Sequence, residues 1–144
     1  MANDILEDYA KDQVLNGYVD GAGLKALVVD DSLAIRRLLR RILEKVGYTV
    51  DEAENGRVAI SKYADFSPNI VAMDITMPEM EGPVALDVIL RNDPAAKVVM
   101  ITSIGDKDSV EDCIRKGAKG YLLKPITDAQ LVKILTLLKQ VAIS

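Results

Sequence analysis

Four short apolar runs and one alternating stretch recur along the chain, and each ends in or is followed by a polar or charged residue. Gly, Pro, Asn and Asp cluster between them, as is typical of turns. Short runs rich in Val and Ile predict strands that are buried on both faces of a sheet, and alternation over 48–53 predicts a half-buried strand. The predicted strands cover 25–29, 48–53, 70–74, 97–101 and 120–123.

Between these strands, apolar residues recur at the spacing of a helix and predict five amphipathic helices. One predicted helix follows each strand. The residues expected to face inward are Ile35, Leu38, Leu39, Ile42, Leu43 and Val46; Val58, Ala59, Tyr63 and Ala64; Ala85, Leu86, Val88, Ile89 and Leu90; Val110, Cys113 and Ile114; and Leu131, Ile134, Leu135, Leu138 and Val141.

Residues suited to helix ends support this pattern. Ser32 can cap the first helix, Asn55-Gly56 is predicted as a turn, and Pro83 suits the first turn of the third helix. Thr127 or Asp128 can cap the last helix. The sequence therefore alternates strand and helix from Lys25 to its end.

This alternation predicts an α/β fold: a five-stranded parallel sheet, doubly wound, with helices on both faces in three layers. Right-handed crossovers place the carboxyl end of every strand at one edge. That edge is expected to collect Asp30 and Asp31, Asp74, Thr102 and Lys124. In open α/β sheets, ligands bind at this edge.

Residues 1–23 stand apart from the alternation and are predicted to form an N-terminal extension, with the domain covering 24–144. Ile5, Leu6, Tyr9, Val14, Leu15, Tyr18 and Val19 recur at roughly helical spacing, and Gly residues follow at 17, 21 and 23. We interpret the extension as a short amphipathic helix joined by a flexible segment, or as a loosely ordered tail.

The amino-acid composition limits the classes of protein and partner that are compatible with this chain. A chain of 144 residues, 49% apolar and 28% charged, is expected to form one soluble globular domain. It has no membrane-length apolar stretch and no secretory signal pattern, which predicts a cytoplasmic protein that does not insert into membranes. The net charge of −4, without a visible run of Lys and Arg, argues against nucleic acid as a partner.

Two residue types exclude further classes. The sequence contains no His, which excludes His-based acid/base catalysis, Ser-His triads and His-ligated zinc within this chain. Cys113 is the only Cys, so an intramolecular disulfide is excluded. Any chemistry must use carboxylates, hydroxyls, Lys or the backbone.

The candidate residues suit phosphoryl chemistry when taken together. Three carboxylates in one pocket need a cation to stay ionised, and Mg²⁺ prefers oxygen ligands and retains room for phosphate oxygens. Lys124 adds a positive charge and Thr102 a hydroxyl, groups that stabilise a phosphoryl group during in-line transfer. A carboxylate can itself accept that group as an aspartyl phosphate.

The same residues carry a family resemblance. The chain from about Lys25 to Val141 resembles the receiver domain of two-component response regulators, which has the flavodoxin-like (βα)5 fold, and most closely the single-domain, chemotaxis-type, CheY-like proteins. The motifs that carry this resemblance are Asp30-Asp31, Ala53-Glu54-Asn55-Gly56, Met73 to Gly82 with Asp74, Met77-Pro78 and Gly82, Asp93-Pro94, Thr102-Ser103, Gly117-Ala118-Lys119-Gly120 and Lys124-Pro125.

The resemblance implies a role for each candidate residue. Asp74 would accept a phosphoryl group from a phosphohistidine, and Mg²⁺ would be held by Asp30, Asp31, Asp74 and the backbone carbonyl of Thr76. Lys124 would pair with the phosphoryl oxygens. Thr102 would move to hydrogen-bond one of them, and Tyr121 would turn inward with it as the switch aromatic.

The resemblance also implies partners. These are a sensor histidine kinase or a His-phosphotransfer protein, a downstream target such as the flagellar motor, and a phosphatase. The readout is expected on the face formed by the fourth helix, fifth strand and fifth helix of a monomer. Because the sequence ends directly after that helix, we expect the output to pass through protein contacts. The chain would catalyse only its own phosphorylation and dephosphorylation and would not be an enzyme in the usual sense.

Alternatives and departures remain. An intermediate phosphotransfer protein or a phosphate sink would use the same site, and a binding-only module would have lost phosphorylation. A phosphatase with an aspartate nucleophile commonly has a second Asp two residues after the first, where this chain has Thr76. Thr76 and Ile104 occupy positions that tune the lifetime of the phosphoaspartate in the family, and the family usually lacks a long N-terminal extension.

Overall fold

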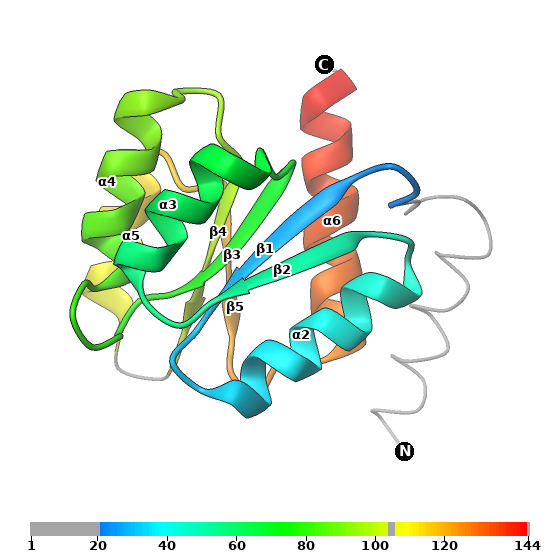
Figure 1. Cartoon of the computed structure of the whole chain (residues 1–144), viewed down its shortest axis with the longest axis horizontal. Coiled ribbons are helices and arrows are strands. Elements are labelled where there is room, and N and C mark those ends of the chain that lie inside the picture. Colours follow the sequence, from blue (N-terminus) through cyan, green and yellow to red (C-terminus); the bar gives the residue numbers. More distant parts are fainter. Residues whose placement is uncertain (1–20, 104–105, 144) are drawn as a thin grey trace.

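The fold is a parallel sheet between two layers of helices (Figure 1). The computed structural model describes residues 21–103 and 106–143. Within these residues, five strands form one sheet in the order β2-β1-β3-β4-β5, and all neighbouring strands are parallel. The doubly wound (βα)5 architecture expected from the sequence is confirmed.

Strands and helices alternate along the chain. The strands are β1 (Lys25–Val29), β2 (Thr49–Ala53), β3 (Ile70–Asp74), β4 (Val98–Thr102) and β5 (Gly120–Leu123). The helices are α2 (Leu33–Lys45), α3 (Gly56–Phe66), α4 (Gly82–Asn92), α5 (Lys107–Lys116) and α6 (Asp128–Ile143). The strands start and end within one residue of the predicted ranges.

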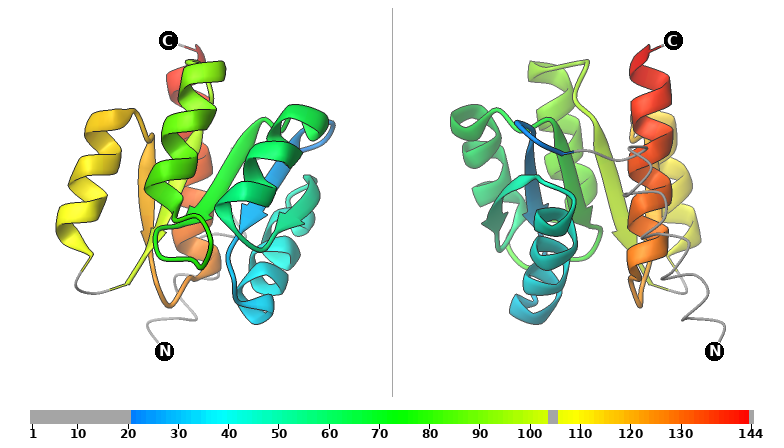
Figure 2. Two further views of the ribbon diagram at one scale, coloured as in Figure 1. Left: turned by 60° about the vertical axis from the view of Figure 1, so that its left-hand side comes forward. Right: turned by 90° about the vertical axis from the view of Figure 1, so that its right-hand side faces the viewer.

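Each face of the sheet has its own apolar core. α2 and α6 pack on one face, and α3, α4 and α5 pack on the other (Figure 2). The alternation of side chains divides β1 between the two cores: Ala26 and Val28 join the first, while Leu27 and Val29 join the second. All of β3 and β4 is buried, which explains their unbroken apolar runs.

Two helix caps follow the sequence pattern. The hydroxyl of Ser32 accepts a hydrogen bond from the backbone N–H of Ile35, 3.3 Å away, at the start of α2. Thr127 does the same for Gln130 at the start of α6, with a distance of 3.2 Å. Both contacts satisfy N–H groups that a helix leaves unpaired at its first turn.

Four details differ from the predictions. Asn55-Gly56 is not a separate turn, because the side chain of Asn55 caps α3 by accepting from the N–H of Val58 and Gly56 is already helical. Ala64 is exposed and Ile114 is 42% exposed, so neither faces the core. Val132 of α6, absent from the predicted stripe, is buried.

Some predictions fall outside what the structure describes. The proposed helix in the extension involves residues 1–20, and the side chain of Val141 is likewise outside the described part. Residues 21–24 lead into β1. Among the described residues, no helix is both long and apolar enough to cross a membrane.

Candidate functional site

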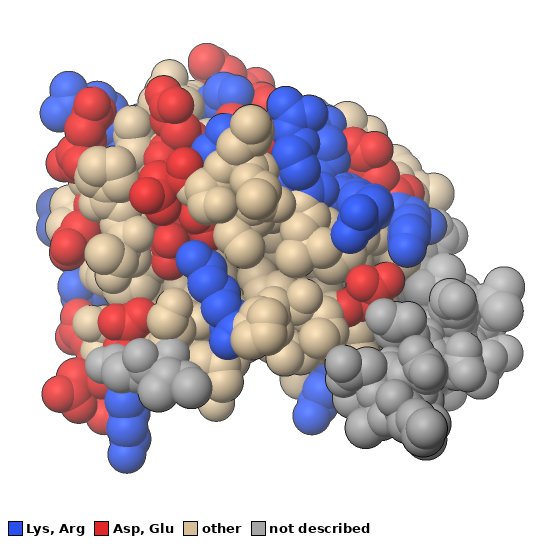
Figure 3. Space-filling view, turned by 90° about the horizontal axis from the view of Figure 1, so that it is seen from below, with Lys and Arg blue, Asp and Glu red and all other residues tan. Residues whose placement is uncertain are grey.

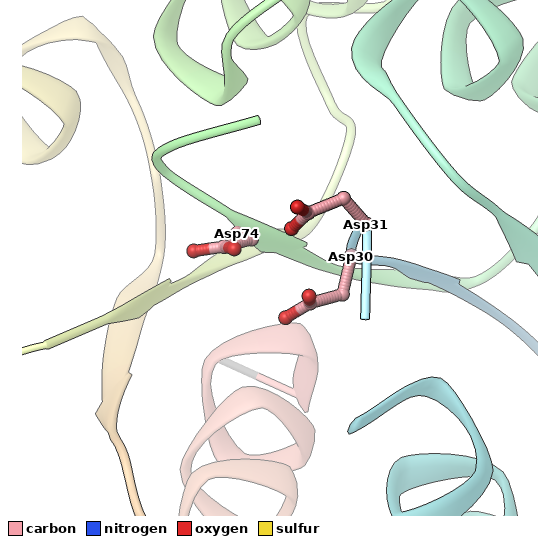
Figure 4. Close-up of side chains that lie close together, drawn as sticks. All are labelled: Asp30, Asp31 and Asp74. Carbon is pink, nitrogen blue, oxygen red and sulfur yellow. The ribbon is translucent and has the colours of Figure 1, made fainter. Parts of the chain in front are cut away.

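Strand register brings the three carboxylates together at the carboxyl ends of the two central strands. Val29 of β1 pairs with Met73 of β3, so Asp30 lies level with Asp74, and Asp31 follows it. In the described part of the chain, one oxygen from each carboxylate lies within 4.8 Å of the others. Figure 4 shows the three side chains at the ends of these strands. The cluster predicted from the sequence is present.

The three carboxylates differ in their surroundings. Asp30 is fully buried, Asp74 is 7% exposed and Asp31 is exposed. Asp30 Oδ1 accepts a hydrogen bond from the backbone N–H of Ser32 at 2.9 Å. Asp30 Oδ2 is also buried, and it forms an ion pair with Lys124. Burying a carboxylate is costly unless positive charge lies beside it, so this site needs cations.

Lys124 supplies the positive charge in this cluster. It follows β5 directly, and its backbone N–H donates to the carbonyl of Thr102 at 2.8 Å, which fixes the strand end beside β4. Its Nζ lies 3.2 Å from Asp30 Oδ2 and 3.3 Å from Asp74 Oδ2. One ammonium group therefore lies within ion-pair distance of two buried carboxylates.

The balance of charge and burial sets the pKa of Asp74. Burial of its carboxyl and the negative charge of Asp30 raise the pKa of Asp74 to about 6, although Lys124 and the backbone N–H of Thr76 lower it. The pKa of Lys124 is raised: partial burial lowers it, but the charges of Asp30 and Asp74 outweigh that effect. At neutral pH the site holds an ionised Asp74 and a charged Lys124.

The donor set fits a hard divalent cation. Asp30, Asp31 and Asp74 offer carboxylate oxygens of the type that Mg²⁺ binds, and the exposure of Asp31 leaves one side open to water or phosphate oxygens. Lys124 supplies one positive charge beside these carboxylates, and a divalent cation would offset the negative charge that remains. The backbone carbonyl of Thr76 as a further ligand stays a prediction.

Mg²⁺ binding is expected to weaken in acid because a proton competes for Asp74. With a pKa of about 6, the carboxyl binds one proton below that pH. The apparent Mg²⁺ affinity should then fall by about tenfold per pH unit below 6 and level off above about 7. Calorimetric titrations between pH 5 and 8 measure this profile. D74N should bind Mg²⁺ more weakly with a flatter profile, and an equally steep profile in D74N would contradict the assignment.

The hydroxyl of Thr102 contacts Ser103 and Asp106 in this structure. Its hydroxyl lies 3.2 Å from the carbonyl oxygen of Ser103 and 3.3 Å from Asp106 Oδ2, and Asp106 Oδ2 also accepts from the N–H of Ser103 at 3.2 Å. Thr102 is only 3% exposed. It is at the predicted edge of the sheet, but it would have to exchange these partners to reach a group on Asp74.

Tyr121 is on the edge strand β5, where its side chain is 54% exposed. Its neighbour in register is Met100 of β4. An outward Tyr is compatible with a switch residue in its resting position and equally with an ordinary strand Tyr. Its role as a switch therefore stays a prediction.

Two site residues escaped the sequence analysis. Arg36 donates from Nη1 to the backbone carbonyl of Asp30 at 2.7 Å and from Nε to Glu52 at 3.1 Å, which holds the end of β1. Asp106 holds Thr102. The only sequence signal was position: Arg36 is in the first turn of the helix after β1, and Asp106 directly precedes α5.

Comparison with known proteins identifies similar sequences. The sequence pattern described as "Response regulator receiver domain" matches residues 26–136. Chemotaxis protein CheY of Thermotoga maritima is 42% identical over 114 residues, which cover 78% of this chain and 95% of that protein. Chemotaxis protein CheY of Bacillus subtilis is 44% identical over 102 residues, which cover 70% of this chain and 85% of that protein.

Solved structures show the same fold. A complex of CheX with CheY, BeF3 and Mg²⁺ from Borrelia burgdorferi matches with a TM-score of 0.77 and 34% identity, covering 81% of this chain and 89% of that one. A receiver domain protein from Clostridium thermocellum matches with a TM-score of 0.76 and 26% identity, covering 84% and 99%.

Proposed function

Because this chain belongs to the response regulator receiver domain family, we propose that it is a phosphorylation-dependent signalling switch with Asp74 as the phosphoryl acceptor. Its donor is a phosphohistidine on a sensor histidine kinase or a His-phosphotransfer protein. The observation that carries the proposal is the position of Lys124 Nζ, 3.2 Å from Asp30 and 3.3 Å from Asp74, beside the exposed Asp31. It acts in the cytoplasm as a monomer.

The chemical step is a phosphoryl transfer to a carboxylate. An oxygen of Asp74 forms a bond to phosphorus while the bond between phosphorus and the donor's imidazole nitrogen breaks, and that nitrogen keeps the electron pair. Receiver domains use Mg²⁺ in this acidic pocket, where the cation offsets the negative charge of the phosphoryl oxygens. In this chain Asp30, Asp31 and Asp74 would hold it, together with the carbonyl of Thr76.

Lys124 orients and neutralises the acceptor. Before transfer, its ammonium group pairs with Asp30 and Asp74. After transfer, one carboxylate oxygen of Asp74 is bonded to phosphorus in a mixed anhydride, and Lys124 pairs instead with a phosphoryl oxygen. The charge is already in place before the reaction, so little reorganisation is needed when negative charge develops.

Thr102 carries the signal away from the site. To donate to a phosphoryl oxygen, its hydroxyl must leave the carbonyl of Ser103 and the carboxylate of Asp106. Asp106 directly precedes α5. Phosphorylation therefore removes a contact that links the end of β4 to the start of α5, which is a local change in charge with a distant consequence.

The output surface is formed by α5, β5 and α6. Among the described residues, four large apolar side chains on these elements are 41 to 54% exposed: Ile114, Tyr121, Leu123 and Leu137. Inward rotation of Tyr121 as Thr102 moves would change this surface, and a downstream protein would bind the changed form. The relatives are chemotaxis proteins, so the flagellar motor is the target class we favour, with a phosphatase as a further partner.

Other uses of the site are weaker. An intermediate phosphotransfer protein or a phosphate sink requires the same acceptor but no output surface. A phosphatase with an aspartate nucleophile would need a general acid near Asp74, and Thr76 stands where such enzymes commonly have an Asp. The chain thus catalyses only its own phosphorylation and dephosphorylation.

Phosphorylation by a small donor tests the proposal. We expect acetyl phosphate and Mg²⁺ to add one phosphoryl group to the full chain, measured by intact-mass spectrometry, with the label lost in hydroxylamine because acyl phosphates react with it. Removing Mg²⁺ with a chelator should slow labelling by more than about tenfold.

Two results would contradict the proposal. Absence of any label under these conditions would remove the acceptor function. Sustained turnover of a phosphate ester, in place of a single round of labelling, would favour the phosphatase. A pull-down with the labelled and unlabelled chains then separates a switch, whose partner binds one form better, from a phosphate sink.

A further inference from the structure

The charge of this chain is divided unequally along its length. Residues 1–20 contain five acidic residues and one Lys, which gives a net charge of −4. The remaining residues contain equal numbers of basic and acidic side chains. The entire net charge of the protein therefore lies in the segment that precedes the domain, and any complementary surface should be basic.

Such a surface exists on α2. This helix carries five basic residues and one acidic residue. Arg36 and Arg40 turn toward Glu52, at 3.1 and 2.6 Å. Lys and Arg side chains form a band over the part of the molecule that α2 occupies, as Figure 3 shows in the view from below. We call Arg37, Arg41 and Lys45 the basic stripe.

The basic stripe is weakly engaged within the domain. The side chains of Arg37 and Lys45 are 66% and 62% exposed, and their ion pairs are long, 3.8 Å to Glu52 and 3.6 Å to Asp128. Arg41 is exposed and forms no ion pair with any described residue. Long ion pairs at exposed positions contribute little, so these cations remain available to another partner.

The N-terminal segment emerges beside this helix. The backbone N–H of Gly21 donates to the carbonyl of Val46, the residue after α2, at 2.6 Å. Gly21 is buried, and a Cβ atom at Gly47 would lie 2.9 Å from the backbone nitrogen of Ala22. The chain is thus held against the carboxyl end of α2 at the point where residues 1–20 begin to extend from it.

The two charged rows have matching spacing. Asp4, Asp8 and Asp12 recur every four residues, as do the three cations of the basic stripe. On a helix, residues four apart lie on one face. We propose that residues 1–20 dock on α2 as a helix, with this acidic row against the basic stripe. Exposed ion pairs are weak one by one, so we expect docking to depend on all three acting together.

Paramagnetic broadening tests the docking in the full chain. A nitroxide is attached at Q13C, with C113A removing the native thiol, and amide signals are compared with those of the reduced, diamagnetic label. We expect signals of α2 to lose at least about half of their intensity while those of α4 and α5 keep theirs, because the nitroxide is held near α2 in the docked form. Equal broadening of α2, α4 and α5 would overturn the proposal.

Charge reversal supplies a matched control. R37E together with R41E should abolish the selective broadening, whereas R91E together with R115E should leave it unchanged, because those two Arg are similarly exposed but lie on α4 and α5. Broadening that survives reversal of the stripe would overturn the charge pairing. A mixture of nitroxide-labelled chains with isotope-enriched chains that carry no nitroxide tests for docking between two copies. Broadening of α2 signals in this mixture would identify a second copy as the occupant and would also overturn the proposal.

Labelling by acetyl phosphate distinguishes the two hypotheses. The R37E/R41E variant should take up one phosphoryl group at the parent rate, because neither Arg is part of the carboxylate site. If neither protein is labelled, the proposed function fails while the docking result stands. If both are labelled but no selective broadening occurs, the docking fails alone.

Discussion

D74N is expected to take up no phosphoryl group from acetyl phosphate under conditions that label the parent chain completely. The amide of Asn cannot attack phosphorus, and neither neighbouring carboxylate replaces Asp74. Asp30 is fully buried, and Asp31, although exposed, lies outside the ion pairs of Lys124. Intact mass after prolonged incubation measures the result, and peptide mapping locates any residual label.

The loss in D74N should not come from unfolding. The pKa of Asp74 in the folded protein, about 6, lies above its ordinary value of 3.8. The folded state therefore binds the proton more tightly than the unfolded state, and stability decreases as the pH rises through about 6. Asn carries no such cost, so D74N should be more stable than the parent at pH 7 by about 1 to 3 kcal/mol. Thermal unfolding provides this control, and label that persists in D74N would refute the assignment.

K124M is expected to slow labelling by about 100-fold while leaving Mg²⁺ binding intact or stronger. The ammonium group that stabilises the phosphoryl oxygens is lost, and removal of one such group typically has an effect of this size. The same ammonium competes with a cation for Asp30 and Asp74, 3.2 and 3.3 Å away, so its removal favours Mg²⁺. Met retains most of the apolar stem of Lys.

K124M is informative because it is expected to slow labelling without weakening Mg²⁺ binding. Labelling rates and calorimetric Mg²⁺ titrations on one K124M preparation measure both quantities. K119M is the matched control, since Lys119 is an exposed Lys just before β5 and its loss changes the net charge equally. A parallel loss of labelling and of Mg²⁺ affinity would show that Lys124 acts by maintaining the structure of the site, contrary to the proposal.

The sheet was predicted well because a strand that is buried on both faces is recognisable as a short apolar run in the sequence. β3 and β4 are apolar up to their last residues, Asp74 and Thr102, which lie at the edge of the sheet where the site is. The same topology predicts that Asp30, Asp74 and Lys124 lie at one edge, where the structure places them. Whole-element properties such as these depend on pattern and connectivity, both of which can be derived from sequence.

Predictions about single side chains were less secure. Ile114 is at a helical spacing that fits the core, yet it is 42% exposed because α5 buries only Cys113 completely. Asn55 resembles a turn residue and instead caps α3 through its side chain. These outcomes depend on how far each helix is rotated about its axis, which neighbouring elements decide.

Hydrogen bonds across the site could not be predicted from the sequence. The hydrogen bond from Arg36 to the carbonyl of Asp30 and the contact of Thr102 with Asp106 join residues by geometry that no spacing rule specifies. The roles of Thr76 and Tyr121 rest on resemblance alone. Hydrogen-bond partners of polar side chains can be chosen among several neighbours, so a pattern of residue types does not determine them.

The strand order makes the centre of the sheet more rigid than its edge at β5. β1 and β3, which hold the acceptor and its acidic neighbours, lie inside the sheet and are buried along almost their whole length. β5 lies at the edge, has four residues and buries only Leu122. Local opening of the sheet should therefore require the least free energy at β5, which contains Tyr121 and directly precedes Lys124. The carboxylate that bonds to phosphorus therefore lies in the rigid interior of the sheet, whereas the residue proposed to respond to phosphorylation, Tyr121, lies on its flexible edge.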